Sequence, residues 1–115
     1  MSKRNAKLFI QDILEAIEKI ENYVAGTDFE SFKKDSKTVD AVIRNLEIIG
    51  EAARNIPEGM KRKYGDIPWR DLVDFRNRIT HEYFGISLTI VWHIIKQELP
   101  QLEKRMKQIL EEVRE

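Results

Sequence analysis

The sequence predicts an all-α fold: one domain, residues 1–115, built as an antiparallel bundle of four to five principal helices. Along most of the chain, apolar residues recur at spacings of three and four, the period of one face of an α-helix. No segment of useful length alternates with period two, and we find no internal repeat. Only three prolines and five glycines are present, which argues against a loop-rich β-sandwich. These observations together favour helices joined by short connections.

The first helix is expected over residues 6–25, with Gly26 as its stop. Its buried stripe is expected to comprise Ile10, Ile13, Ile17, Ile20 and Val24. Thr27 and Glu30 have the spacing of a capping box, with Thr27 as the cap, so a short helical turn through Lys34 should follow.

A second long helix is expected to begin after Asp35 or Ser36 and to end before Pro57. Its apolar stripe is Val39, Val42, Leu46, Ile49, Ala53 and Ile56. Gly50 lies in its middle, either as tolerated strain or because another helix approaches closely there. A second face carries charges at helical spacing and is interpreted as solvated, with ion pairs along the helix: Arg44, Glu47, Glu51 and Arg54.

Four further helical segments complete the bundle. Residues 57–64 should form one or two turns with a basic cluster, and a turn then leads to Pro68 at the start of the third principal helix. The third helix has Trp69, Leu72, Val73, Arg76 and Ile79 at helical spacings. Ser87 should cap the fourth, and Pro100 is expected to interrupt it and open a final helix. His93, on the fourth helix, is interpreted as structural.

Charge and composition exclude several classes of function. Twenty basic and twenty acidic residues give no global field to attract nucleic acid, so any such binding needs a local patch. The absence of cysteine excludes disulfides, thiolate zinc sites and a cysteine nucleophile. No apolar run approaches the roughly 20 residues that span a bilayer, and no signal peptide is recognised. We therefore expect a cytoplasmic protein without membrane contact, and zero net charge is compatible with self-association.

The candidate site is the run from Arg76 to Tyr83, which reads Arg-Asn-Arg-Ile-Thr-His-Glu-Tyr. Arginine with histidine, and no metal ligands, suits attack at phosphorus. Arginine can bind a phosphate bidentately and stabilise transition-state charge, while histidine can move a proton. Five residues on a straight helix correspond to a rotation of about 140°, however, so Arg76 and His81 do not share a face. They converge only if the helix ends or distorts near His81, or if another subunit completes the site.

The same run resembles the Arg-x-x-x-x-His-x-Tyr signature of the HepT-like toxins of the HEPN superfamily. The similarity extends over about residues 8–110. It includes segments 45–52 (Asn-Leu-Glu-Ile-Ile-Gly-Glu-Ala), 67–70 (Ile-Pro-Trp-Arg), 83–85 (Tyr-Phe-Gly), 91–95 (Val-Trp-His-Ile-Ile) and 99–100 (Leu-Pro).

This resemblance implies a HEPN-like helical bundle and a metal-independent endoribonuclease toxin of a type VII toxin–antitoxin system, which acts as a homodimer on RNA and needs no cofactor. By analogy, Arg76 would bind the scissile phosphate and His81 would be the general acid/base. The 2′-hydroxyl of RNA would be the nucleophile, leaving a 2′,3′-cyclic phosphate. Asn77, Arg78 and Glu51 would support the site. A minimal nucleotidyltransferase antitoxin would transfer AMP to Tyr83 and block RNA. No DNA binding is expected.

Two other interpretations remain open from the residues alone. The chain could be a non-catalytic helical subunit that binds a nucleotidyltransferase and presents Tyr83 without cutting RNA. It could also be a helical oligomerisation domain in which the motif only satisfies a helix end. Intact Arg76, Asn77 and His81 argue against a pure scaffold, because a scaffold has no evident need for all three.

Overall fold

The computed structural model describes residues 5–82 and 85–113, and no strand occurs in these two ranges. Tyr83, the predicted modification site, lies outside the described residues. The elements are α1 (Ala6–Val24), α2 (Phe29–Lys34), α3 (Ser36–Arg54), α4 (Glu58–Lys63), α5 (Trp69–His81), α6 (Leu88–His93), the π-helix η2 (Ile94–Glu98) and α7 (Leu99–Val113). Four long helical rods result, because α6, η2 and α7 are continuous.

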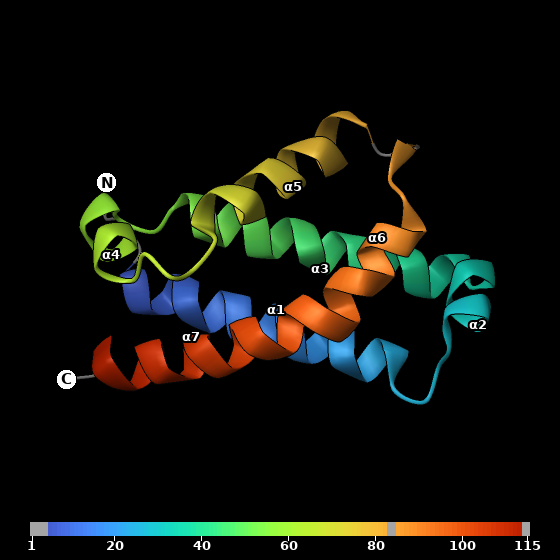
Figure 1. Cartoon of the computed structure of the whole chain (residues 1–115), viewed down its shortest axis with the longest axis horizontal. Coiled ribbons are helices and arrows are strands. Elements are labelled where there is room, and N and C mark those ends of the chain that lie inside the picture. Colours follow the sequence, from blue (N-terminus) through green and yellow to red (C-terminus); the bar gives the residue numbers. More distant parts are fainter. Residues whose placement is uncertain (1–4, 83–84, 114–115) are drawn as a thin grey trace.

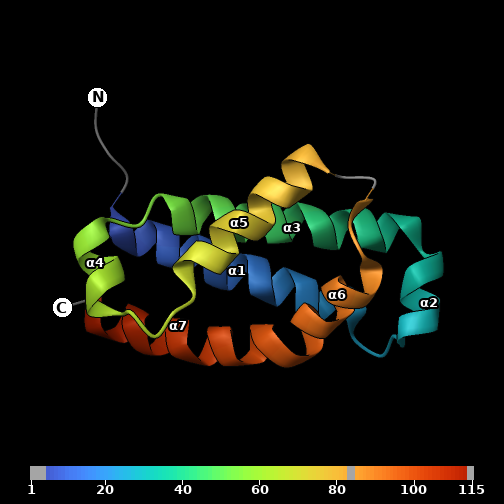
Figure 2. The ribbon, with the colours of Figure 1, turned by 45° about the horizontal axis from the view of Figure 1, so that its top comes forward.

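The four rods run in alternating directions along the chain, as in an antiparallel bundle (Figure 1). Helix α1 packs against both α3 and α7, and these three lie side by side with similar axes. Helix α5 crosses over α3 at a larger angle, which is clearest in Figure 2. The short helices α2 and α4 lie at opposite ends of the bundle.

The core lies where α1, α3 and α7 meet, and it is rich in isoleucine. All four isoleucines of the predicted α1 stripe are fully buried: Ile10, Ile13, Ile17 and Ile20. Helix α3 contributes Val42 and Ile49, and α7 contributes Met106 and Ile109. Burying one such side chain contributes roughly 1.5–3 kcal/mol, so these eight buried side chains stabilise the fold substantially.

The helix starts follow from local side-chain chemistry, with one correction. The predicted cap Thr27 is wrong: Asp28 caps α2, and its Oδ1 accepts the backbone N–H of Ser31 at 2.8 Å. Asp35 caps α3 in the same way, accepting from the N–H of Thr38 at 3.2 Å. Gly26 adopts a φ of 72° just beyond α1, in the left-handed region that favours glycine, and so ends that helix as predicted.

The prediction at Pro100 is correct in one part and wrong in the other. A final helix, α7, begins at Leu99 with Pro100 in its first turn, as predicted, but the rod continues through this point without a break. Proline has no N–H to donate, so an ordinary α-helix would lose a hydrogen bond at this point. The chain instead widens into the π-helix η2, where the N–H of Leu99 donates to the carbonyl of Ile94, five residues earlier. This wider turn accommodates Pro100 in the first turn of α7 without ending the rod.

Helix α5 is held much less firmly than the other rods. Of its thirteen residues only Trp69 and Ile79 are buried, whereas α3 buries nine of nineteen. Trp69 fixes the start of the helix by donating its indole N–H to the carbonyl of Tyr64 at 3.0 Å. Among the described helices, none is long and apolar enough to cross a membrane.

Candidate functional site

The candidate site begins at a very close contact between α3 and α5. A Cβ added to Gly50 would overlap the Cβ of Arg76 and lie 2.7 Å from the carbonyl oxygen of Leu72. Of the two interpretations of Gly50, close approach of another helix is therefore the correct one. Because glycine has no side chain, the backbone of α3 can lie directly against the stem of Arg76.

Arg76 is fixed at this contact by partners from both helices. Its Nη2 is 3.0 Å from Oε2 of Glu51 on α3, and its Nη1 donates to Oδ1 of Asn77 at 3.1 Å. Its Nε is buried and has no hydrogen-bond acceptor among the described residues. The side chain is 24% exposed, so the guanidinium is held in one orientation with part of its surface open to solvent.

The charged face of α3 is less solvated than the sequence suggested. Arg44 pairs with Glu47 at 3.1 Å and Arg54 lies 4.0 Å from Glu51, both at the predicted spacing of three. Both carboxylates also face α5, because Glu51 reaches Arg76 and Oε2 of Glu47 is 3.4 Å from the hydroxyl of Thr80. This face therefore joins the two helices through polar contacts.

A polar hollow of about 230 Å³ lies beside Arg76, between α1, α3 and α5. Its charged lining consists of two arginines, Arg44 and Arg76, and three carboxylates, Asp12, Glu47 and Glu51. Negative charge thus slightly exceeds positive charge here. A phosphate that approaches Arg76 must use the solvent-facing part of the guanidinium or displace Glu51.

His81 does not join Arg76 within one chain. Helix α5 is regular through His81, which is its last residue and is exposed. The rotation of about 140° between the two positions is therefore retained. Asn77 lies four residues before His81 and so shares its face, while its Oδ1 contacts Arg76. Asn77 thus lies between the two predicted catalytic groups.

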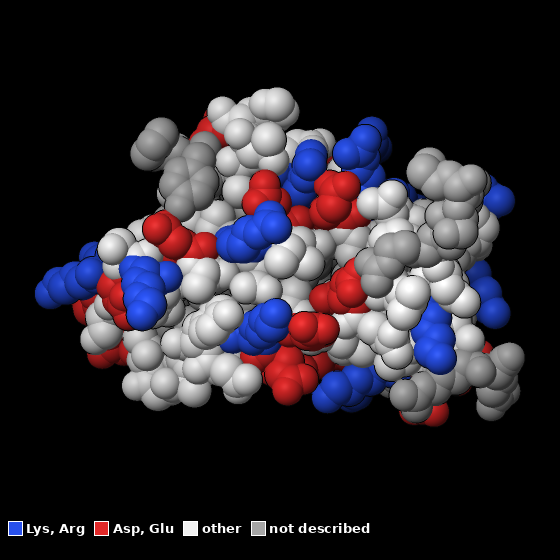
Figure 3. Space-filling model, turned by 180° about the vertical axis from the view of Figure 1, so that it is seen from behind, with Lys and Arg blue, Asp and Glu red and all other residues white. Residues whose placement is uncertain are grey.

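The remaining basic residues are not gathered at the site. Arg78 is exposed, and its Nε lies 3.9 Å from Oε2 of Glu82, away from the pairing of Arg76 with Glu51. The cluster Lys61, Arg62 and Lys63 lies on α4, near the start of α5, whereas His81 is at its far end, about 18 Å along the helix. Figure 3 shows, on the face opposite to Figure 1, basic and acidic residues interspersed without a field of one sign.

Two features of the site were missed from the sequence. Glu47 and Thr80 contact each other across α3 and α5, and the hollow reaches α1 at Phe9 and Asp12. The sequence contained one indication of these contacts, because Glu47 and Glu51 lie on either side of Gly50 in the same predicted helix. Among the described residues, no group of three histidine or carboxylate side chains is arranged to hold a metal ion.

Comparison with known proteins identifies the class to which this helical bundle belongs. The model of the family described as "Ribonuclease HepT-like" matches residues 13–109. A protein of Thermococcus cleftensis named "Probable ribonuclease HepT" is 43% identical over 107 residues, 93% of this chain and 97% of the relative. A protein of Methanocaldococcus jannaschii named as a "Putative RNase" is 38% identical over 113 residues, 98% of this chain and 93% of the relative. No solved structure matches.

The match covers most of the chain, and the chain belongs to the HepT-like ribonuclease family. The resemblance predicted from the signature and its flanking segments is thereby confirmed, as is the all-α, HEPN-like fold class.

Proposed function

We propose that this protein is an endoribonuclease toxin that cuts RNA without a metal ion, at a site formed by two subunits. Arg76 of one subunit binds the scissile phosphate, and His81 of the other moves the proton. One observation carries the proposal: in a chain of a ribonuclease family, the guanidinium of Arg76 is half-buried and is oriented by contacts with Glu51 and Asn77.

The reaction requires no nucleophile from the protein. The 2′-oxygen of the RNA attacks the adjacent phosphorus and forms a new O–P bond, while the bond from phosphorus to the 5′-oxygen breaks. His81 accepts the proton of the 2′-hydroxyl as base or donates one to the leaving 5′-oxygen as acid. Arg76 stabilises the charge that develops on the phosphate oxygens. The products are a 2′,3′-cyclic phosphate and a free 5′-hydroxyl.

The geometry of α5 supports a site shared between two subunits. Because α5 is regular through His81, one chain directs Arg76 and His81 to different faces. A two-fold axis beside the end of α5 would place the histidine of one copy opposite the arginine of the other. Two such sites would lie across one cleft.

Glu51 is proposed as the positioning residue for Arg76. Arginine has five N–H donors, and the contacts of Nη2 with Glu51 and of Nη1 with Asn77 leave others for a phosphate. A guanidinium that is already oriented loses less side-chain entropy on binding than a free one. Arg78, which is exposed and directed toward Glu82, is proposed only as a supporting charge for the RNA backbone.

The experiment is cleavage of a labelled RNA by the purified protein in EDTA, with analysis of the product ends. We expect 2′,3′-cyclic phosphate ends, and a loss of at least about 100-fold in rate for Arg76→Ala and for His81→Ala. His93→Ala and Arg70→Ala are the matched controls, because both side chains are exposed and lie outside the site. Cleavage by His81→Ala at the wild-type rate would refute the proposal.

We further propose that a minimal nucleotidyltransferase partner inhibits the toxin by transferring AMP to Tyr83. The tyrosine oxygen would attack the α-phosphorus of ATP, with a new O–P bond formed and pyrophosphate released. Tyr83 is two residues from His81 in sequence, so the added negative charge would repel an RNA phosphate. The basis for this proposed step is the resemblance of the run from Arg76 to Tyr83 to the HepT-like signature.

Intact mass measurement after co-expression with the partner tests this modification. We expect mass increases in units of AMP that disappear in Tyr83→Phe. Tyr23→Phe is the matched control, because Tyr23 is the exposed tyrosine of α1, 43% accessible. An unmodified protein, or modification that persists in Tyr83→Phe, would contradict the assignment.

The second candidate is a non-catalytic binding subunit for the same partner. It is favoured by one observation, that Arg76 is paired with Glu51 in a hollow with more acidic than basic groups. A tight complex whose affinity is unchanged in Arg76→Ala and His81→Ala, with no RNA cleavage in EDTA, would support it against the ribonuclease.

A further inference from the structure

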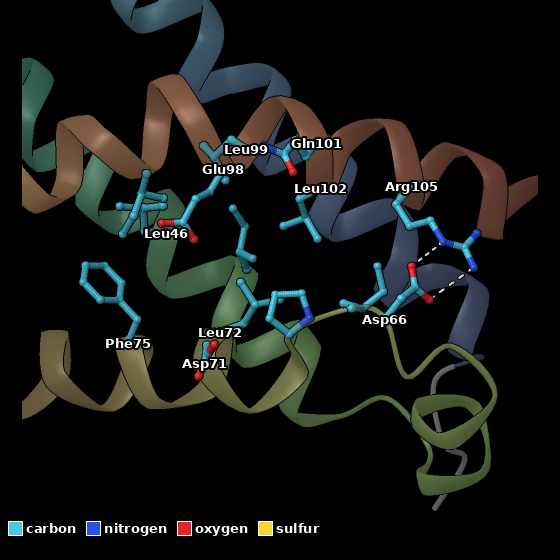
Figure 4. A pocket seen from close by; sticks show the side chains of 14 residues that line it. Leu46, Asp66, Asp71, Leu72, Phe75, Glu98, Leu99, Gln101, Leu102 and Arg105 are labelled. Atoms are coloured by element: carbon cyan, nitrogen blue, oxygen red, sulfur yellow. Dashed lines mark hydrogen bonds and ion pairs between the residues drawn. The ribbon is translucent and has the colours of Figure 1, made fainter.

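A second cavity lies away from Arg76, between α5 and the rod formed by η2 and α7. Its volume is about 400 Å³, and none of its lining residues lines the polar hollow. Its inner walls are apolar, with Ile49 and Leu99 only 1% exposed and Leu102 7% exposed. Figure 4 shows Leu72 and Phe75 of α5 facing this space from one side and Leu99 and Leu102 from the other.

The cavity exists because α5 packs on α3 and leaves the space toward η2 and α7 unfilled. The π-helix forms part of the opposite wall, where it places both Ile94 and Glu98 at the cavity. One end is closed by an ion pair, with Arg105 Nε 2.7 Å from Oδ2 of Asp66 and Nη2 3.3 Å from Oδ1 (Figure 4). The guanidinium of Arg105 is therefore paired with Asp66, and its Nη1 donates to the side chain of Gln108.

The polar groups at this cavity are predominantly acidic. Asp71 on α5 and Glu98 on η2 line it from opposite sides, together with the amide of Gln101. Oε2 of Glu98 lies 3.7 Å from Nε2 of His93, and the two form a charged pair only when the histidine is protonated. Within the part of the chain that the structure describes, no lysine or arginine pairs with Asp71 or Glu98.

We propose that this cavity is a binding site for a small organic cation, with an aromatic or branched alkyl body and a primary ammonium group. Its volume is in the range of small-molecule sites, which are mostly apolar with a few polar groups that fix orientation. The apolar body would occupy the space between Leu72, Leu99 and Leu102, and the ammonium would donate to Asp71 and Glu98.

The charges also argue against two other occupants. The phosphates of RNA would be repelled by the carboxylates at the mouth. A second copy that docked the same face across a two-fold axis would bring the Asp71 and Glu98 side chains of both copies into one interface, because both copies use the same surface. Gathering these like charges in one interface opposes association.

The experiment is an NMR titration of the full chain, with 2-phenylethylammonium as the probe. The matched ligands are 2-phenylethanol, which is neutral, and phenylacetate, which is anionic. We expect methyl shifts at Leu46, Leu72 and Leu102, and an affinity for the cation about five- to tenfold above that for the alcohol. Phenylacetate should bind most weakly. Equal affinities for the three ligands, no binding of the cation, or shifts elsewhere on the protein would overturn the proposal.

A double variant, Asp71→Asn with Glu98→Gln, tests the role of charge without disturbing the core, because both side chains are exposed. We expect the preference for the cation over the alcohol to disappear while the alcohol still binds. The control is Glu15→Gln with Glu18→Gln on α1, two exposed carboxylates that do not line the cavity, and it should keep the preference. A double variant at the cavity that retains the full preference would contradict the proposal.

Discussion

The two sides of α5 differ sharply in how they are packed. Toward α3, the contact at Gly50 has no room for one methyl group, and it is crossed by the ion pair of Glu51 with Arg76. Toward η2 and α7, a cavity of about 400 Å³ remains. The helix that carries the predicted catalytic residues is thus positioned from one side. Its register on α3 determines where Arg76 lies, while its other side leaves space that a ligand can fill.

The largest effect should come from changing the guanidinium on the tight side. We expect Arg76→Lys to lower the rate of RNA cleavage at least about 100-fold, because an ammonium cannot contact Glu51, Asn77 and a phosphate in the planar geometry of arginine. The initial rate in EDTA is the measurement. Arg70→Lys, an exposed arginine on the same helix, should cleave at nearly the wild-type rate. Full activity of Arg76→Lys would show that the fixed guanidinium is not needed.

Gly50→Ala tests the tight contact itself. The added methyl must push α5 away from α3, which we expect to lower the free energy of unfolding by about 1–3 kcal/mol, partly offset by better helix propensity. Urea denaturation measures this change, and RNA cleavage should fall with it. Gly59→Ala in α4 is the matched control, because its added methyl would meet no atom within 4 Å. A Gly50→Ala protein as stable as Gly59→Ala would contradict the close contact.

The loose side should tolerate a much larger addition. Phe75→Trp adds atoms to a side chain that lines the cavity, and we expect a change of less than about 1 kcal/mol in the free energy of unfolding, because the volume is available. Urea denaturation of Phe75→Trp and Gly50→Ala in parallel compares their free energies of unfolding directly. If the tryptophan destabilises as strongly as the single methyl at Gly50, the two sides of α5 do not differ as described.

The smallest effect on RNA cleavage is expected at the N-terminal cap of α3, which lies on neither side of α5. Hydrogen bonds from the side chain and backbone of Thr38 lower the pKa of Asp35 below its ordinary value of 3.8. A carboxylate with a lowered pKa in the folded state stabilises the fold above its unfolded pKa, and this stabilisation is lost as pH falls through the folded value. Asp35→Ala should therefore be less stable than wild type at pH 7, with cleavage in EDTA unchanged. The difference in stability should shrink below pH 3.8, and a difference independent of pH would contradict this role of the cap.

The features of the fold that depend on a local sequence pattern were predicted correctly. The stripes of Ile10, Ile13 and Ile17, and the stop at Gly26, follow from spacing and backbone conformation within a single helix. Thr27 was a wrong cap because two adjacent residues both suit that position and only backbone geometry decides between them. Pro100 was correctly predicted to open the final helix, but the break expected before it is absent, because a π-helix leaves no sequence pattern as clear as proline itself.

The site could be predicted only in part, because its contacts join separate helices. The sequence indicated the run from Arg76 to His81 and the poor angle between those two residues. It could not decide whether Gly50 touches another helix, nor show that Glu51 reaches Arg76, because both depend on how α3 and α5 cross. The cavity beside Phe75 likewise could not be predicted, because it depends on the space that remains between α5 and the rod of η2 and α7.

Subunit complementation tests the central claim, a site with Arg76 from one subunit and His81 from the other. Arg76→Ala and His81→Ala, each inactive alone, are unfolded together, refolded as a mixture and assayed for RNA cleavage in EDTA. Random pairing makes about half of the dimers mixed, and in each mixed dimer one of the two sites has both residues. We therefore expect recovery of about a quarter of the wild-type rate. If both residues act within one subunit, every site in the mixture lacks one of them. A mixture as inactive as its two components, although mixed dimers form, would contradict the shared site.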